Sequence, residues 1–323
     1  MDKPPTWVVG AGGLLGGHVA DGFRRHGHPV LTSTVPWHDR ERSVLALRAD
    51  AETLLDRARG GPWNIAWCAG TGVMATAEAE LAAEESMFAD FTGDLASAVS
   101  RRKDAAHGAF FFASSAGGVY AGSPDRPPFD EGSTPRALAP YGMAKLAMER
   151  HARNFASATS TAVLIGRIAN LYGPGQDLTK QQGLVSQMCR SVLTGQPLSI
   201  YVSLDTLRDY VFADDCANMV VAGLSGVRIP ARDGGTVVTK ILASGRATTI
   251  GSLLSEGNRV LKRRPRVMVK AQAASSVQAR DLRLRSVIWP DLDRCARTSL
   301  AVGIARTAED VSMQLRSAKR RQV

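Results

Sequence analysis

Short apolar runs alternate with longer amphipathic stretches through the first half of the chain. The runs have the length of buried strands, and the stretch from Leu14 to Phe23 repeats apolar residues at helical spacing until Gly27 closes it. Such alternation predicts an α/β protein with a parallel sheet wound by crossover helices. We expect strands at Thr6–Val9, Val30–Thr34, Ile65–Cys68, Ala109–Ala113 and Ala162–Ile168, and further helices over about 77–102 and 140–156.

The alternation loosens after Gly173-Pro174-Gly175. A final helix is predicted near the end of the chain, with Thr307 as its cap and Asp310 three residues on. The loop 123–140 is rich in Pro, Gly and Ser and lies between a strand and a helix, where active-site loops often lie. Between Gly175 and Thr307 we predict a helix near 184–194 and strands at Leu198–Val202 and Thr236–Ala243. The segment Asp209–Phe212 lies between these two strands.

The composition is that of an ordinary globular protein, with 44% apolar, 22% charged and 6% aromatic residues. It excludes disorder, collagen-like repeats and coiled coil. Uninterrupted apolar runs are too short to span a membrane. The first 25 residues carry Asp2, His18, Asp21 and several glycines, which argue against a signal peptide, so we expect a cytoplasmic protein.

The net charge of +10 comes from 40 basic and 30 acidic residues, and 32 of the basic residues are arginine. Arginine binds phosphate well, so the surplus permits an anionic ligand, although a solvated surface explains most of it. The basic runs 262–266 and 319–321 lack interleaved aromatic residues, so we expect no nucleic-acid partner. Four scattered cysteines without a C-x-x-C pair indicate reduced thiols rather than a metal site.

A glycine-rich turn follows the first predicted strand and opens the first predicted helix. Its glycines allow a tight turn, a close approach of the backbone to a pyrophosphate, and close helix packing. The helix N-terminus adds amide donors and a partial positive charge. The segment therefore predicts a dinucleotide site that includes Gly10, Gly13, Leu14, Leu15 and Gly16.

The choice between NAD and NADP depends on the end of the second strand. NAD-specific sites usually carry an acidic residue there, which holds the ribose 2′-hydroxyl. This chain has Thr32-Ser33-Thr34 instead. Arg40 and Arg42 follow, either as ligands of a 2′-phosphate or as plain surface residues. The prediction is NAD or NADP, with NADP slightly favoured.

Tyr141 and Lys145 lie four residues apart in a predicted helix that begins at Pro140. Because four residues make about one helical turn, roughly 6 Å of rise, both side chains emerge on the same face. A nearby ammonium favours the phenolate, so the lysine would prepare the tyrosine to act as a general base. Ser114 and Ser115 end a buried strand, where open α/β sheets bind ligands, and are read either as catalytic hydroxyls or as turn formers.

Together these segments resemble the extended short-chain dehydrogenase/reductase family, in its nucleotide-sugar epimerase/dehydratase branch. The resemblance covers nearly the whole chain. It includes the glycine turn, the segment that leads to Val119-Tyr120, and the Tyr–Lys pair. It also includes Arg167-Ile168-Ala169-Asn170-Leu171-Tyr172-Gly173-Pro174-Gly175 and Arg208-Asp209-Tyr210-Val211-Phe212-Ala213-Asp214-Asp215.

The resemblance implies a role for each matching residue. Tyr141 would be the general base and acid, Lys145 would bind the ribose and tune Tyr141, and Ser114 or Ser115 would orient the substrate. Asp50 would contact the adenine, although it is also interpreted as the cap of the next helix. The remaining implied contacts are Ala69 and Gly70 beneath the cofactor, Asn170 and Arg208 on the sugar nucleotide, and Arg280 or Arg283 as a second diphosphate ligand.

Two departures from the family pattern restrict the chemistry. The usual catalytic hydroxyl position holds Ala116, so either Ser115 replaces it or the following glycines reshape the turn. Gly117 and Gly118 stand where sugar 4,6-dehydratases carry an Asp-Glu pair, which disfavours dehydration. We therefore favour an NAD(P)-dependent nucleotide-sugar epimerase, with an NADPH-dependent ketoreductase next and a non-catalytic dinucleotide-binding regulator last.

The resemblance also implies the architecture. A Rossmann-type, doubly wound domain would occupy 1–172 and 205–246, and a smaller discontinuous substrate domain 173–204 and 247–323. Family members usually dimerise through two helices per subunit, so a homodimer is expected.

Overall fold

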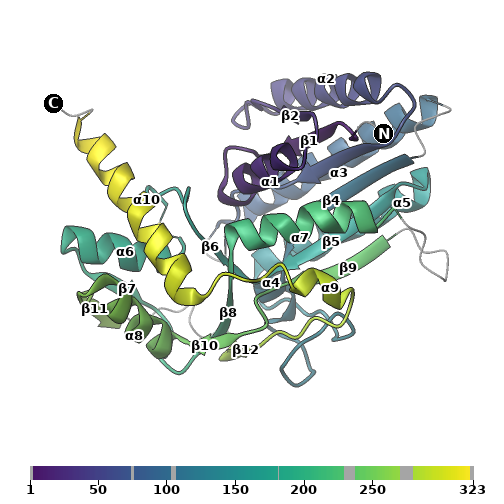
Figure 1. Cartoon of the computed structure of the whole chain (residues 1–323). Coiled ribbons are helices and arrows are strands. Elements are labelled where there is room, and N and C mark those ends of the chain that lie inside the picture. Colours follow the sequence, from purple (N-terminus) through teal and green to yellow (C-terminus); the bar gives the residue numbers. More distant parts are fainter. Residues whose placement is uncertain are drawn as a thin grey trace.

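Six parallel strands form the main sheet, in the order β2-β1-β3-β4-β5-β9 (Figure 1). The computed structural model describes residues 3–73, 76–102, 107–180, 182–228, 237–269 and 279–320. The strands are β1 Thr6–Val9, β2 Val30–Thr32, β3 Trp63–Trp67, β4 Gly108–Ser115, β5 Ala162–Ile168 and β9 Val237–Leu242. The predicted α/β fold with a parallel sheet is confirmed. Thr236, the predicted start of the last of these strands, lies outside the described residues, as does part of the basic run 319–321.

Helices cover both faces of this sheet, which makes it doubly wound. On one face lie α2 (Arg40–Ala58), α3 (Glu78–Arg101) and α5 (Pro140–Thr159), and on the other α1 (Leu14–Arg25) and α7 (Ala213–Gly226). The first face buries an aromatic cluster in which Trp67, Phe88 and Phe91 meet edge-on or tilted. Burying each such ring stabilises the fold by roughly 1.5–3 kcal/mol, so these helices are held firmly against the strands.

The usual dinucleotide-binding sheet has one more strand outside β2. That strand is absent from the main sheet described here, so the connection from β2 to β3 is shorter. Here the single helix α2 makes the whole crossover. Its N-cap is Asp39, whose side chain accepts from the backbone N of Arg42. Asp50 therefore lies inside α2, and its interpretation as a helix cap is wrong.

A smaller lobe is built from the segments that follow β5 (Figure 1). Its centre is β8, which pairs with β6, β10 and β12, while β7 and β11 form a separate pair. Its apolar core lies among the helices α6, α8 and α10. The elements are β6 Asn170–Tyr172, α6 Leu184–Thr194, β7 Leu198–Ile200, β8 Leu207–Phe212, β10 Ala247–Thr249, α8 Ile250–Leu261, β11 Val267–Val269, β12 Asp281–Leu282 and α10 Leu300–Arg320. The short helix α9 (Pro290–Asp293) packs against α7 of the main sheet instead.

The last helix begins earlier than predicted. Thr307 lies inside α10, where its hydroxyl donates to the carbonyl oxygen of Gly303 at 2.7 Å, and the backbone N of Val302 donates to the Ser299 hydroxyl at the true start. The predicted cap at Thr307 is wrong because the helical pattern extends back to Leu300. In the part of the chain that the structure describes, each helix is too short or too polar to cross a membrane.

Candidate active site

The glycine turn packs directly against the end of β3. Gly10 has a φ of +85°, and a Cβ there would lie 2.6 Å from the backbone N of Ala69. A Cβ on Gly16 would lie 2.1 Å from the carbonyl oxygen of Gly10, to which the backbone N of Gly13 donates at 3.0 Å. The structure thus brings the predicted glycines and Ala69 together, and the spacing at Gly10 and Gly16 leaves no room for a side chain.

Helix α1 begins at this turn with its first amides uncapped by a side chain. Its N-cap is Gly13, which offers no hydrogen-bonding side chain. The first N–H groups of a helix have no partner within the helix and carry a partial positive charge, which suits an anionic ligand. Leu15, 7% exposed, anchors the first turn in the core between α1 and α7.

Tyr141 and Lys145 share one face of α5, as predicted. The Lys145 Nζ atom lies 5.8 Å from the centroid of the Tyr141 ring. A Cβ on Gly118 would be 3.2 Å from that ring, and a Cβ on Gly142 would be 2.1 Å from the Gly118 carbonyl oxygen. These glycines let the short helix α4 (Ala116–Tyr120) approach the start of α5. Glycine at position 118 is therefore explained by the close packing of α4 against α5. It stands where dehydratases carry an acidic residue.

The two candidate serines differ in their surroundings. Ser114 is 4% exposed, and its hydroxyl donates to Glu149 Oε1 at 2.7 Å. Ser115 is half-buried and caps α4 by accepting from the backbone N of Gly118 at 3.2 Å. Ala116 is fully buried in α4. The Ser114 hydroxyl thus donates its hydrogen to Glu149, whereas the Ser115 hydroxyl only accepts a hydrogen bond and can still donate its own hydrogen.

A buried ion pair behind the site was missed by the sequence analysis. Glu149 and Arg167 are 3% and 4% exposed and form two hydrogen bonds, of 3.0 and 2.8 Å. Arg167 also donates to the Tyr120 hydroxyl, at 2.7 Å. Burial opposes its charge, but the bonds to Glu149 outweigh burial and raise the pKa of Arg167. Glu149 continues the four-residue repeat of Tyr141 and Lys145, and that repeat is the signal that would have revealed it.

A second acidic residue, Glu84 of α3, was also missed. Its carboxylate accepts from Lys145 Nζ at 3.1 Å and from the backbone N atoms of Thr71 and Gly72 at 3.1 Å each. No sequence motif marks it, because the partners lie on separate elements.

The predicted substrate residues lie in the smaller sheet. Asn170 begins β6, pairs with Tyr210 and donates to the carbonyl oxygen of Asp209 at 2.9 Å. Arg208 is 8% exposed and donates to the carbonyl oxygen of Leu207. Burial lowers the pKa of Arg208, and among the described residues it forms no ion pair. A buried, unpaired guanidinium suits a phosphate group.

Strand β12 runs beside Arg208 and places the two alternative arginines near it. Arg280 is exposed and pairs with Asp205, and Arg283 pairs with Asp281. Hydrogen bonds from Arg283 outweigh burial and lower the pKa of Asp281. The geometry does not choose between Arg280 and Arg283.

The end of β2 carries hydroxyl side chains without a carboxylate. Ser33 accepts a hydrogen bond from Trp7 Nε1 at 2.5 Å, and Thr32 and Thr34 are exposed. Arg40 donates to Ser86 at 2.9 Å and is ion-paired with Asp90, while Arg42 pairs with Asp39 at 3.3 Å. Both arginines are therefore engaged with other side chains. Asp50 lies half-buried in the middle of α2.

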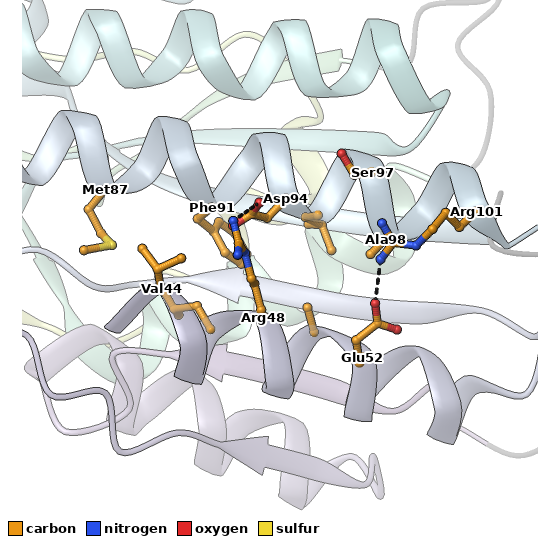
Figure 2. Close-up of a pocket in the computed structure, with 12 residues that line it drawn as sticks. Val44, Arg48, Glu52, Met87, Phe91, Asp94, Ser97, Ala98 and Arg101 are labelled. Atoms are coloured by element: carbon orange, nitrogen blue, oxygen red, sulfur yellow. Dashed lines mark hydrogen bonds and ion pairs between the residues drawn. The ribbon is translucent and has the colours of Figure 1, made fainter. Parts of the chain in front are cut away.

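A groove of about 390 Å³ lies between α2 and α3, apart from this site (Figure 2). Its floor is apolar, and the ion pairs Arg48–Asp94 and Arg101–Glu52 cross it. None of the predicted site residues lines it.

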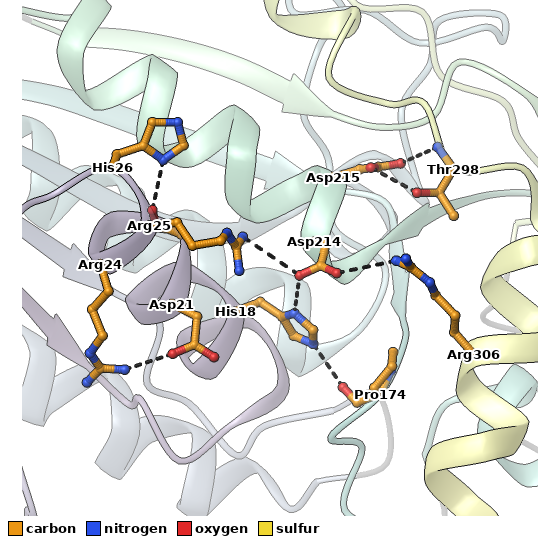
Figure 3. Close-up of polar contacts among 11 residues, drawn as sticks. His18, Asp21, Arg24, Arg25, His26, Pro174, Asp214, Asp215, Thr298 and Arg306 are labelled. Atoms are coloured by element: carbon orange, nitrogen blue, oxygen red, sulfur yellow. Dashed lines mark hydrogen bonds and ion pairs between the residues drawn. The ribbon is translucent and has the colours of Figure 1, made fainter.

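A histidine joins α1 to the segments that lead into the smaller lobe (Figure 3). His18 Nδ1 lies 2.7 Å from Asp214 Oδ1, and Nε2 lies 2.9 Å from the carbonyl oxygen of Pro174. Both partners are acceptors, so the ring makes both bonds only when both nitrogens carry hydrogen. Arg25 and Arg306 lie 4.0 and 3.8 Å from the same carboxylate. Burial opposes the positive charge of the ring, but the hydrogen bonds to Asp214 and Pro174 outweigh it and raise the pKa of His18.

Comparison with known proteins agrees with this geometry. The family model described as "NAD dependent epimerase/dehydratase family" matches residues 6–230. A dTDP-L-rhamnose 4-epimerase of Burkholderia thailandensis is 36% identical over 117 residues, which cover 36% of this chain and 31% of that protein. A dTDP-4-dehydro-6-deoxyglucose reductase of Escherichia coli is 31% identical over 113 residues, 35% of each chain. The matches thus span about a third of these relatives.

Solved structures share the fold over nearly the whole chain. A Thermus thermophilus UDP-glucose 4-epimerase in complex with NAD has a TM-score of 0.76 at 18% identity, covering 95% of this chain and 99% of that one. MoeE5 in complex with UDP-glucose and NAD has a TM-score of 0.76 at 23% identity, covering 96% and 99%. At these identities the likeness shows the fold alone.

Proposed function

Because the chain belongs to the NAD dependent epimerase/dehydratase family, we propose that it is an NAD(P)-dependent nucleotide-sugar epimerase. The observation that carries the proposal is the placement of Tyr141 and Lys145 on one face of α5, beside the loop that follows β3. That loop also touches the glycine turn through Ala69. One site thus combines a proton-transfer pair with a dinucleotide cradle.

The residues of the cradle fit a dinucleotide. The uncapped start of α1 offers amide donors to a pyrophosphate, and the missing side chains at Gly10 and Gly16 let the backbone pack closely. Gly13, Leu14, Leu15 and Gly70 complete the proposed contacts. When bound, the dinucleotide supplies a hydride acceptor and donor.

Each side chain has a defined task in the proposed reaction. Tyr141 takes the proton of a sugar hydroxyl and later returns it, and the Lys145 ammonium favours its phenolate form. Ser115 donates a hydrogen bond to the reacting oxygen, because the hydroxyl of Ser114 already donates to Glu149. Arg208 holds the substrate diphosphate, and Asn170 lies beside it in the same small sheet.

The preference for NADP rests on the end of β2. Thr32, Ser33 and Thr34 leave the ribose 2′-position without a carboxylate, which removes the repulsion that would exclude a 2′-phosphate. Arg40 and Arg42 support this preference less than expected, because both are paired. Titration with NADPH and NADH tests it, and tighter binding of NADH would refute it. A homodimer and a cytoplasmic location remain predictions.

The second candidate is an NADPH-dependent ketoreductase, because one relative is named a reductase and the required residues are the same. The third is a cofactor-binding regulator without turnover. Denaturing the purified protein and identifying the released dinucleotide separates the first two. Near-stoichiometric cofactor favours the epimerase, whereas an empty protein that binds NADPH favours the reductase.

The test of the proposed function is the variant Tyr141→Phe. Its control is Tyr201→Phe, which removes the same hydroxyl group from a tyrosine of the smaller lobe. We expect the first variant to lose turnover of UDP- and dTDP-sugars while its cofactor affinity stays within about twofold, because the ring remains in place. The control keeps its activity. An unchanged rate in Tyr141→Phe would remove this residue from the mechanism.

A further inference from the structure

Glu84 lies within the proposed site and contacts three of its parts. Its side chain is 18% exposed, and Lys145, with a side chain 7% exposed, donates to it at 3.1 Å. The second carboxylate oxygen accepts from the backbone N atoms of Thr71 and Gly72. The carboxylate therefore joins α3, the loop after β3, and the lysine of α5.

The loop is shaped around this carboxylate. A Cβ on Gly70 would lie 2.7 Å from Glu84 Oε1 and 3.4 Å from Lys145 Nζ. A Cβ on Gly72 would lie 3.3 Å from Glu84 Oε2 and 3.5 Å from the Tyr141 ring. Glycine at both positions lets the loop close over the ion pair and touch the tyrosine. Movement of any one of these groups would displace the others.

The charge of Glu84 acts on the same ammonium that is proposed to activate Tyr141. A lysine favours a nearby phenolate through its positive charge. Here the Lys145 ammonium lies 3.1 Å from the Glu84 carboxylate and 5.8 Å from the ring centroid of Tyr141. The ammonium is therefore closer to the carboxylate than to the tyrosine ring. Lys145 has three donors, and its bond to Glu84 uses one of them and fixes its direction. The others remain for a ribose.

We propose that Glu84 is a positioning residue of this site: it fixes the loop 70–72 and Lys145 relative to Tyr141, and its charge offsets that of Lys145. The proposal rests on the proposed function, which gives the tyrosine and the lysine their roles. It adds a residue that sets both the ionisation of Tyr141 and the affinity for the dinucleotide.

The experiment compares Glu84→Gln with Glu85→Gln, the adjacent residue of α3, which contacts His151 instead. Tyrosine ionisation is followed by ultraviolet absorbance in a Tyr201→Phe background. The other three tyrosines are buried, and burial raises the pKa of each (Tyr120, Tyr172 and Tyr210). In this background the part of the absorbance change that Tyr141→Phe removes is assigned to Tyr141.

We expect Glu84→Gln to move the ionisation of Tyr141 to lower pH by about one unit, since the lysine charge is no longer offset. The dissociation constants of NADPH and NADH should rise by at least about fivefold, because an amide cannot accept from both the loop and Lys145 as a carboxylate does. Glu85→Gln should change neither quantity.

A lowered melting temperature with unchanged ionisation and cofactor affinity would overturn the proposal and leave Glu84 a structural residue. If Glu84→Gln does not fold, Glu84→Asp serves instead, and it should weaken cofactor binding while the ionisation of Tyr141 stays in place. Unchanged cofactor affinity in that variant would also overturn the proposal. Neither readout needs a substrate, so absent turnover would count against the proposed function alone.

Discussion

Removing the arginine of the buried pair Glu149–Arg167 should destabilise the protein strongly. In Arg167→Met the Glu149 carboxylate loses the two hydrogen bonds from Arg167, of 3.0 and 2.8 Å, keeps only the one from Ser114, and stays 3% exposed to solvent. Tyr120 loses a donor to its hydroxyl as well. Breaking a buried ion pair by removing one partner costs about 3–5 kcal/mol.

The expected change in melting temperature follows from the size of the chain. For 323 residues the entropy of unfolding is about 0.7 kcal/mol per kelvin, so the loss corresponds to a decrease of about 4–7 K. Calorimetry or circular dichroism at neutral pH measures it. In the double variant with Glu149→Met, neither charge of the buried pair remains, so most of the decrease should be recovered.

Two results would refute this reasoning. A decrease below about 2 K in Arg167→Met would mean that water or another group compensates the Glu149 charge. A double variant no more stable than the single one would mean that the loss comes from packing rather than from an unpaired charge. Arg153→Met is the matched control, because the Arg153 side chain is 43% exposed and lies 3.9 Å from the same carboxylate.

Three further predictions concern other parts of the molecule. Gly16→Ala should lower the melting temperature and weaken NADPH binding at least about tenfold, because its Cβ would meet a backbone carbonyl oxygen at 2.1 Å. The control Gly12→Ala has open space around its Cβ and should leave the melting temperature unchanged. The ion pair of His18 with Asp214, which raises the pKa of the histidine, should stabilise fully below the unfolded value of about 6.5 and lose its effect as the pH rises through the folded value. Urea unfolding of His18→Gln should therefore show its largest deficit near pH 5–6 and its smallest near pH 9, and a gap independent of pH would contradict this. Arg208→Met should raise the KM for the nucleotide sugar at least about tenfold with little change in cofactor affinity, and an unchanged KM would exclude the diphosphate contact.

Local patterns in the sequence predicted much of this protein. The strands at Thr6–Val9 and Ala162–Ile168 have the predicted bounds, because a buried strand needs only a short apolar run. The glycine turn and the Tyr141–Lys145 pair were equally readable. Each depends on residues within about two helical turns, where backbone geometry alone decides what lies together.

Longer-range order was beyond such patterns. The crossover by α2 placed Asp50 inside a helix, and the early start of α10 did the same for Thr307. Short apolar or polar segments fit more than one element, and packing against the sheet decides between them.

Side-chain contacts between distant segments were decided only by the tertiary structure. Lys145 meets Glu84 across 61 residues, and His18 meets Asp214 across 196. Such pairs depend on the order of the strands and on which helices cover which face, and neither leaves a periodic trace in the chain. The sequence thus determined the local machinery, while the charges that surround and tune it were set by the packing of separate elements, because electrostatic contacts depend on distance in space rather than along the backbone.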